Sequence, residues 1–129
     1  MDVLQIIKSE FSIEKTVARL IEQINESGWH LFAHIDHAEQ ARKNNLDLRP
    51  TQLILLGNPK IGTLLMQDCQ TAAIDLPAKI LVWQGEDGLT YIGYNSKEWL
   101  ERRHHLKDRA TLKAIDQTLE NVCKAAAHQ

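Results

Sequence analysis

The sequence predicts an α+β fold: a single domain with a mixed, largely antiparallel sheet of about five strands and helices packed on it. Strand-like and helix-like segments alternate along the chain. Two late strands, 79–84 and 89–94, are joined by Gly85-Glu86-Asp87-Gly88, which is typical of an antiparallel hairpin. The chain has 129 residues, which is enough for one core, so residues 1–129 are predicted to form one domain.

The first third of the chain predicts two strands and two helices. A strand is expected over 3–10, and a second over 30–35, where apolar and polar residues alternate. Between them, Ser12 is a good N-cap for a helix with an apolar stripe, and Gly28 ends that helix. Asp36 and Glu39 have capping-box spacing, which predicts a short helix from 37 to about 44.

The middle of the chain predicts a buried strand that turns sharply into a helix. The strand is expected over 52–56, which contains the apolar run 53–56, and Asn58 is a good N-cap for a helix from Pro59 to about Asp68. Residues 71–77 are expected to be a connecting loop. Asn95 and Glu98 again have capping-box spacing and predict a helix after the hairpin, and Asp108 caps a last helix over about 108–126.

Composition excludes several classes of protein. Apolar residues make up 43%, charged residues 25%, and the net charge is −2, so no nucleic-acid partner is expected. Apolar runs are too short to span a bilayer, so no membrane partner is expected either. The N-terminus lacks a secretory signal, which predicts a cytoplasmic location. Cys69 and Cys123 are then expected to be free thiols.

The turn 57–63 is the first candidate site. A helix start presents free N–H groups at the positive end of the helix dipole, which suits an anion. Asn58, Lys60 and Thr63 are therefore candidate ligands for a small anionic or polar molecule. The Lys-Ser/Thr pair of a nucleotide-triphosphate loop is missing after Gly62. The simpler reading is that Asn58 and Pro59 only shape the turn.

His34, Asp36 and His37 are the second candidate site, because imidazoles bind metals or move protons near neutral pH. A metal would need a further ligand from elsewhere, such as Asp75. The simpler reading makes Asp36 an N-cap and the histidines surface residues. No cofactor is predicted, although a metal is possible at this site.

Two further groups have ordinary structural explanations. His104 and His105, with two preceding arginines, are expected to complement the dipole at a helix C-terminus. Aromatic residues on or near the hairpin favour the core. These are Trp83, Tyr91, Tyr94 and Trp99.

Four segments resemble domain-of-unknown-function family 302. They are I-D-H-A-E-Q-A (35–41), L-I-L-L-G-N-P-K-I-G-T-L-L-M (53–66), A-I-D-L-P-A-K-I-L-V-W (73–83) and Y-N-S (94–96). The match runs in order over about 9–106, before the last helix. The resemblance implies an α+β fold like that of the TATA-binding protein, often dimeric, and no agreed reaction, substrate or cofactor.

Three functions follow as hypotheses. The first is a non-catalytic module that binds a small anionic or polar ligand at the 58–63 turn. The second is a metal-dependent or proton-transfer enzyme that uses His34, Asp36 and His37, although no catalytic motif is recognised. The third is a homodimeric structural or interaction protein. If the strands that precede the two candidate sites are parallel neighbours, both sites share one edge of the sheet.

Overall fold

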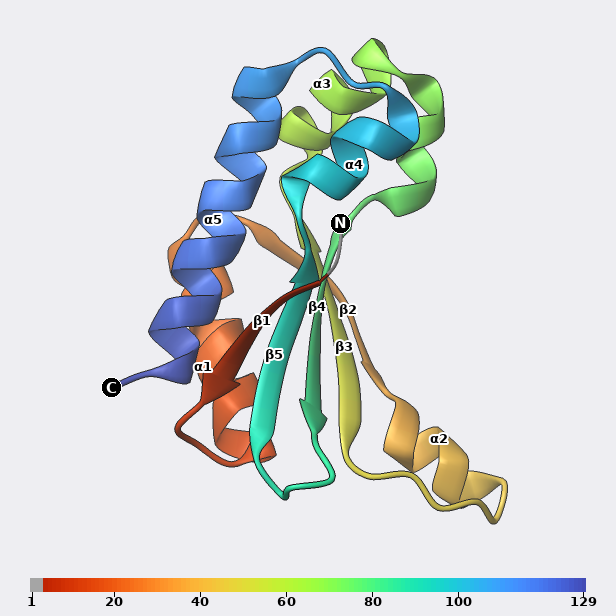
Figure 1. Ribbon diagram of the computed structural model, residues 1–129, viewed down its shortest axis with the longest axis vertical. Helices are drawn as coiled ribbons and strands as arrows, with labels where there is room; N and C mark the ends of the chain where they lie inside the picture. Colours follow the sequence, from red (N-terminus) through yellow and green to blue (C-terminus); the bar gives the residue numbers. More distant parts are fainter. Residues whose placement is uncertain (1–3) are drawn as a thin grey trace.

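The computed structural model describes residues 4–129 as a sheet with helices on one face and at both ends (Figure 1). The strands are β1 (Leu4–Ser9), β2 (His30–Asp36), β3 (Thr51–Gly57), β4 (Ala78–Gln84) and β5 (Thr90–Asn95). The helices are α1 (Ile13–Glu26), α2 (His37–Lys43), α3 (Pro59–Asp68), the 3-10 helix η1 (Gln70–Asp75), α4 (Lys97–His104) and α5 (Arg109–Ala127). The predicted first residue of β1, Val3, lies outside the described residues.

The sheet has the order β1-β5-β4-β3-β2, and every pair of neighbouring strands is antiparallel. The predicted α+β fold is confirmed, while the expectation of a mixed sheet is wrong for these residues. The connections explain the difference. The connection through α3 and η1 between β3 and β4 returns the chain at the end at which it left the sheet, whereas α1 carries the chain from one end to the other between β1 and β2, which are not neighbours.

One face of the sheet is covered by α1 and α5, which lie side by side (Figure 1). Six strand side chains point into this layer and are at most 5% exposed: Ile54, Leu56, Ile80, Val82, Ile92 and Tyr94. The predicted stripes of both helices complete the core, and Leu20, Ile24 and Cys123 are fully buried. This burial supplies most of the favourable free energy of folding.

The opposite face of the sheet carries no helix of the described residues, and the row along its centre is apolar. Its central row, given by the strand register, is Ile6, Gly93, Leu81, Leu53 and Ile35. Ile6 is 56% exposed. Beside this row, the Trp83 and Tyr91 rings stack with their centroids 5.7 Å apart. The expectation that both aromatics lie in the core is therefore wrong, whereas Tyr94 does lie there.

Helices α1 and α4 each begin at an N-cap residue whose side chain accepts a hydrogen bond from an amide in the first turn. Ser12 accepts from the Lys15 amide, as predicted. In α4 the cap is Ser96, which accepts from the Trp99 amide at 3.2 Å, and the prediction of Asn95 is wrong by one residue. Asn95 is instead the last residue of β5, because its backbone is still paired with β1.

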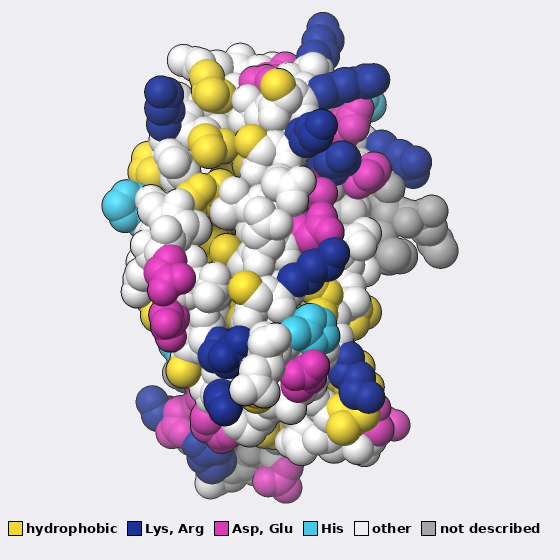
Figure 2. All heavy atoms as spheres, turned by 90° about the vertical axis from the view of Figure 1, so that its left-hand side faces the viewer, with side chains coloured by type: hydrophobic (Ala, Val, Ile, Leu, Met, Phe, Trp, Pro, Cys, Tyr) yellow, Lys and Arg dark blue, Asp and Glu magenta, His cyan; other side chains and the backbone are white. Residues whose placement is uncertain are grey.

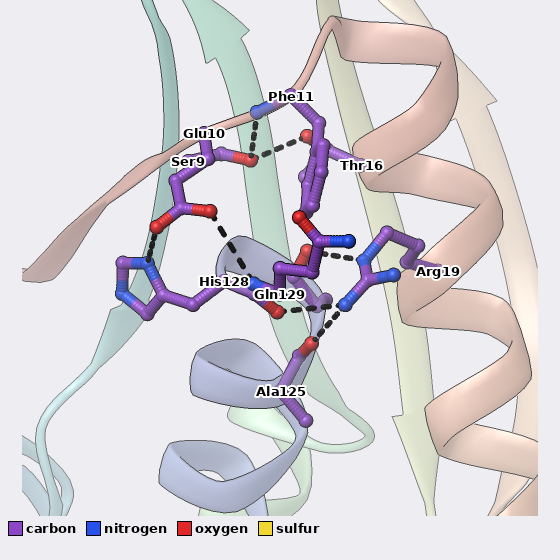
Figure 3. A network of polar contacts seen from close by, with 9 residues as sticks. Ser9, Glu10, Phe11, Thr16, Arg19, Ala125, His128 and Gln129 are labelled. Atoms are coloured by element: carbon purple, nitrogen blue, oxygen red, sulfur yellow. Dashed lines mark hydrogen bonds and ion pairs between the residues drawn. The ribbon is translucent and has the colours of Figure 1, made fainter.

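The C-terminal turn of α5 is held against the start of α1 (Figure 3). Arg19 donates from Nη2 to the carbonyl oxygens of Ala125 and His128, at 2.8 and 2.7 Å. Its Nε donates to the carbonyl oxygen of Ala126 at 3.0 Å. These charge-assisted bonds satisfy carbonyl groups that have no partner within the helix, so they fix α5 on the sheet.

The helix side of the molecule shows charges of both signs interspersed, with apolar side chains between them (Figure 2). A face of this kind does not concentrate a single sign of potential, which agrees with the small net charge. Among residues 4–129, no helix combines the length and the apolar character needed to cross a membrane.

Candidate functional site

The 57–63 turn is a capped helix start, as the sequence predicts. The Asn58 side chain accepts through Oδ1 from the amides of Lys60 and Ile61, at 3.0 and 3.5 Å. The Gly62 amide donates to the Asn58 carbonyl oxygen at 2.9 Å. The amides that were expected to be free for an anion are therefore already bonded, and that part of the expectation is wrong.

A pocket of about 270 Å³ nevertheless opens at this turn. Its walls are largely apolar and come from β2, β3, the turn, α3, η1 and α5. Its lining side chains include Trp29, Phe32, Asn58, Met66, Leu76 and Ile115. Phe32 is 51% exposed and lies over Gly57, so one wall of the pocket is an aromatic ring open to solvent. We call this cavity the turn pocket.

The polar groups at the turn pocket are few. Asn58 uses its Oδ1 as the helix cap, which fixes its Nδ2 as the free end of the amide, and no described residue accepts from Nδ2. The Thr63 hydroxyl donates to the Pro59 carbonyl oxygen at 2.7 Å and keeps its acceptor lone pairs. Lys60 is exposed and does not line the walls. The turn pocket therefore offers mostly apolar surface, and the Asn58 side-chain amide is among the few polar groups that line it.

The residues of the predicted metal site have other partners. His34 Nε2 lies 2.6 Å from Gln52 Oε1, and Asp36 caps α2 by accepting from the Glu39 amide at 3.0 Å. His37 is the exposed first residue of α2. Within residues 4–129, no three His, Cys, Asp or Glu side chains gather in a way that could hold a metal ion. The simpler reading, a cap and surface histidines, describes this arrangement.

The two predicted sites lie toward opposite ends of the sheet. β2 and β3 are antiparallel, with His30 opposite Gly57 and Asp36 opposite Gln52. The turn pocket is therefore at the end where β3 finishes, and α2 is at the other end (Figure 1). A joint site, which requires parallel neighbours, is excluded by this register.

Asp75, the suggested further metal ligand, belongs to a cluster that sequence reasoning missed. His104 Nε2 lies 2.5 Å from Asp75 Oδ2, and Arg103 Nε lies 3.3 Å from the same oxygen. The His104 side chain is only 4% exposed. His104 is thus a buried partner of a carboxylate from η1, whereas the sequence placed it among exposed charges at a helix end. The two positions are 29 apart in the sequence, and this separation carries no spacing signal.

The Cys123 thiol is buried in the core, and burial raises its pKa above the ordinary range for cysteine. Burial likewise raises the pKa of the Tyr94 phenol, with nearby Cys123 and Asp116 adding to the effect. Both groups stay neutral at physiological pH, so neither brings a charge into the core between the sheet and α5. Neither group lines the turn pocket.

Comparison with known proteins identifies the family. The family model "Domain of unknown function DUF302" matches residues 5–126, which extends the resemblance through α5, and the chain belongs to this family. A crystal structure of an uncharacterized conserved protein DUF302 from Bacillus stearothermophilus has a TM-score of 0.84 to this chain. It is 20% identical, with 95% of this chain and 97% of the other covered, so it shows the same fold.

Two relatives carry the name fluoride-specific ion channel FluC 1. They come from Brucella suis biovar 1 (strain 1330) and Brucella abortus biovar 1 (strain 9-941), and each is 35% identical over 123 residues. The match covers 94% of this chain but only 48% and 46% of those proteins. The chain thus spans about half the length of these relatives, whose name describes the whole protein.

Proposed function

We propose that this member of the DUF302 family is a non-catalytic binding module whose ligand occupies the turn pocket. The ligand is a small molecule with an apolar body and one hydrogen-bond acceptor, such as an aromatic carboxylate. The observation that carries the proposal is the pocket itself, about 270 Å³ of mostly apolar surface at the turn that the sequence had singled out. An apolar cavity with one convergent polar group is the usual form of a small-molecule site.

The size of the turn pocket limits the ligand. A cavity of about 150 Å³ accommodates benzene, and drug-sized sites begin at about 300 Å³. A volume of about 270 Å³ therefore suits one ring with a short substituent. Met66 and Leu76 can adjust to such a ring, because methionine in particular is unbranched and flexible.

The donor at the pocket determines the orientation of the ligand. Asn58 Nδ2 is held in place because the cap bond fixes the other end of the amide. A carboxylate or carbonyl oxygen accepting from Nδ2 would lie near the positive end of the α3 dipole, with Lys60 exposed nearby. The proposed ligand thus keeps the anionic group that the sequence predicted. Its apolar body is added because the walls of the turn pocket are largely apolar.

The relatives named as ion channels are compatible with this role. Over half of each of those proteins lies outside the matched region, so a binding module could serve as an accessory part of a larger protein. The channel activity is a property of those whole proteins.

The test is a titration with benzene, benzamide and benzoate, followed by amide chemical shifts of the ¹⁵N-labelled protein. We expect shifts at Gly57, Gly62 and the Asn58 side-chain amide, with benzamide and benzoate binding more tightly than benzene. Asn58→Asp keeps the cap acceptor but removes the donor and adds a negative charge. The variant should bind benzoate about tenfold or more weakly than wild type, while its affinity for benzene should be nearly unchanged.

Asn25→Asp is the matched control, because Asn25 is exposed on α1 and does not line the pocket. The proposal is overturned if millimolar benzamide and benzoate leave the three probes unmoved. It is also overturned if Asn58→Asp and Asn25→Asp change benzoate affinity equally.

A second candidate function is self-association through the open face of the sheet. The observation that favours it is the apolar row from Ile6 to Ile35, flanked by the Trp83 and Tyr91 rings. Exposed apolar patches of this kind mark protein interfaces, and a stable dimer needs about 800 Å² from each partner. A second copy could pair the two faces about a two-fold axis.

Sedimentation at micromolar concentration tests this assembly. We expect a dimer that Ile6→Lys dissociates, because the lysine would place a charge in the paired face. Ile74→Lys is the control, since Ile74 is 69% exposed in η1, away from the sheet. A monomeric wild type at this concentration would remove the hypothesis.

A further inference from the structure

Beyond the turn pocket, four side chains form a continuous hydrogen-bonded chain at the same end of the sheet. Cys69 Sγ lies 3.2 Å from Thr71 Oγ1, and Thr71 Oγ1 lies 3.3 Å from His104 Nδ1. His104 Nε2 lies 2.5 Å from Asp75 Oδ2. We call these four residues the Cys69 relay. They come from the junction of α3 and η1, from η1 and from α4.

The donors in the Cys69 relay can be assigned in one direction. An ionised Asp75 carboxylate only accepts, so it fixes the proton of a neutral His104 ring on Nε2. His104 Nδ1 is then an acceptor, and the Thr71 hydroxyl donates to it. The Thr71 oxygen keeps lone pairs that accept from the Cys69 thiol. Each group thus donates to the next one toward the buried carboxylate.

This arrangement has the parts of an activated nucleophile. A nucleophile needs a base within hydrogen-bond reach and a third group that orients the base. Here His104 is the base, Asp75 orients it, and the thiol reaches it through one hydroxyl. Between the two possible nucleophiles, the Cys69 thiol is far more acidic than the Thr71 alcohol, and it is the stronger nucleophile.

We propose that Cys69 is a nucleophilic thiol, activated through Thr71 by the His104–Asp75 pair, that forms a mixed disulfide with small-molecule disulfides. The thiol proton passes to the Thr71 oxygen while the Thr71 proton passes to His104 Nδ1. The Cys69 thiolate attacks one sulfur of the disulfide, so a new S–S bond forms and the old one breaks. The departing thiolate takes up the proton held by His104, which returns the ring to its neutral form while Cys69 stays in the mixed disulfide.

The surroundings of the relay favour this charge separation. A protonated His104 would face the Asp75 carboxylate, which is also contacted by Arg103 Nε. The other acid close in sequence, Asp68, is occupied by the backbone amides of Lys107 and Asp108, at 2.8 Å each. Asp75 is thus the acid in direct contact with the imidazole, and Arg103 contacts the same carboxylate oxygen.

The thiol is also reachable. Cys69 is half-buried and Thr71 is exposed, so a small disulfide can approach the sulfur from the Thr71 side. The other cysteine of the chain, Cys123, is fully buried in the core and its pKa is raised by burial. Cys123 therefore serves as an unreactive internal reference in the same molecule.

The experiment measures the rate of reaction with Ellman's reagent, an aryl disulfide, on the folded protein at neutral pH. We expect one fast thiol per chain, located at Cys69 by peptide mass spectrometry and lost in Cys69→Ser. Thr71→Val removes the relay hydroxyl at nearly constant shape and should slow the reaction about tenfold or more. Thr71→Ser restores a hydroxyl and should recover most of the rate.

Two further variants separate activation from simple exposure. Asp75→Asn should slow Cys69 in the same way as Thr71→Val, because the amide has no negative charge to stabilise the imidazolium and can donate as well as accept, so it no longer fixes the tautomer of the ring. Thr51→Val makes the same chemical change on β3, far from the relay, and should have no effect. Equal rates in wild type and Thr71→Val, or no recovery in Thr71→Ser, would overturn the proposal. A reaction confined to Cys123 would do the same.

Discussion

Gly62 in α3 provides a sharp test of how the turn pocket is built. Gly62 is the fourth residue of the helix, and its amide donates to the Asn58 carbonyl oxygen. A methyl group added at this position would meet only Leu76 Cδ1 and Met66 Cε, both at 3.9 Å, which is ordinary contact. Gly62→Ala therefore gains helix propensity without a clash.

The expected gain follows from this geometry. Alanine is favoured over glycine in a helix by about 1 kcal/mol. With an unfolding entropy of about 2.1 cal/mol/K per residue over 129 residues, this corresponds to a rise in Tm of about 4 °C. The new methyl group also lies in the pocket wall, so the variant should bind benzoate more weakly than wild type.

Gly57→Ala is the matched contrast at the other side of the same pocket. Its added methyl group would lie 3.2 Å from Phe32 Cε2 and 3.4 Å from Pro77 Cβ. The contact with Phe32 is tight, so this exposed ring must shift by a few tenths of an ångström, whereas the Pro77 contact is ordinary; we therefore expect Gly57→Ala to be less stable than Gly62→Ala. Urea denaturation followed by circular dichroism measures both variants. A Gly62→Ala protein no more stable than wild type would refute the reasoning.

Three other predictions concern single side chains. Asn58→Ala removes the α3 cap and should cost about 1 kcal/mol in urea denaturation. Burial raises the pKa of Asp116, so its charged form opposes folding. Asp116→Asn should therefore raise Tm at pH 7. The Tm difference between the variant and wild type should shrink as the pH falls toward the ordinary pKa of 3.8. His105 ends α4 with φ 53°, so His105→Gly should gain about 0.5–1 kcal/mol by thermal unfolding.

Local rules predicted the elements well. The caps Ser12, Asp36, Asn58 and Asp108 each accept from the amide that the capping rules require. Such bonds depend on residues two or three positions apart, so the sequence contains all of the information needed. The cap of α4 was misplaced because Asn95 and Ser96 are both good caps, and only the pairing of β5 with β1 decides between them.

The chemistry of the sites was less predictable. The location of the pocket follows from the turn, but its apolar character comes from Trp29, Phe32, Leu76 and Ile115, which reach it from three separate parts of the chain. A helix start suggests an anion only when its amides are free, and here the cap that identifies the helix also occupies those amides. Asn58 therefore identified the place of the pocket correctly, but its side chain also occupies the amides that were predicted to bind an anion.

The antiparallel sheet explains why both proposed sites lie at one end of the molecule. At the end with the proposed sites the connections are 58–77 and 96–108, whereas the opposite end has the β4–β5 turn, residues 85–89, and the β2–β3 connection, residues 37–50. Connections of that length fold into α3, η1 and α4, and they are where a rigid sheet leaves room for function. The 3-10 helix η1 belongs to both sites, because Ala73 lines the turn pocket while Thr71 and Asp75 belong to the Cys69 relay. A ligand in the turn pocket that shifted η1 would therefore also change the distances within the Cys69 relay, which a measurement of Cys69 reactivity with and without benzoate would detect.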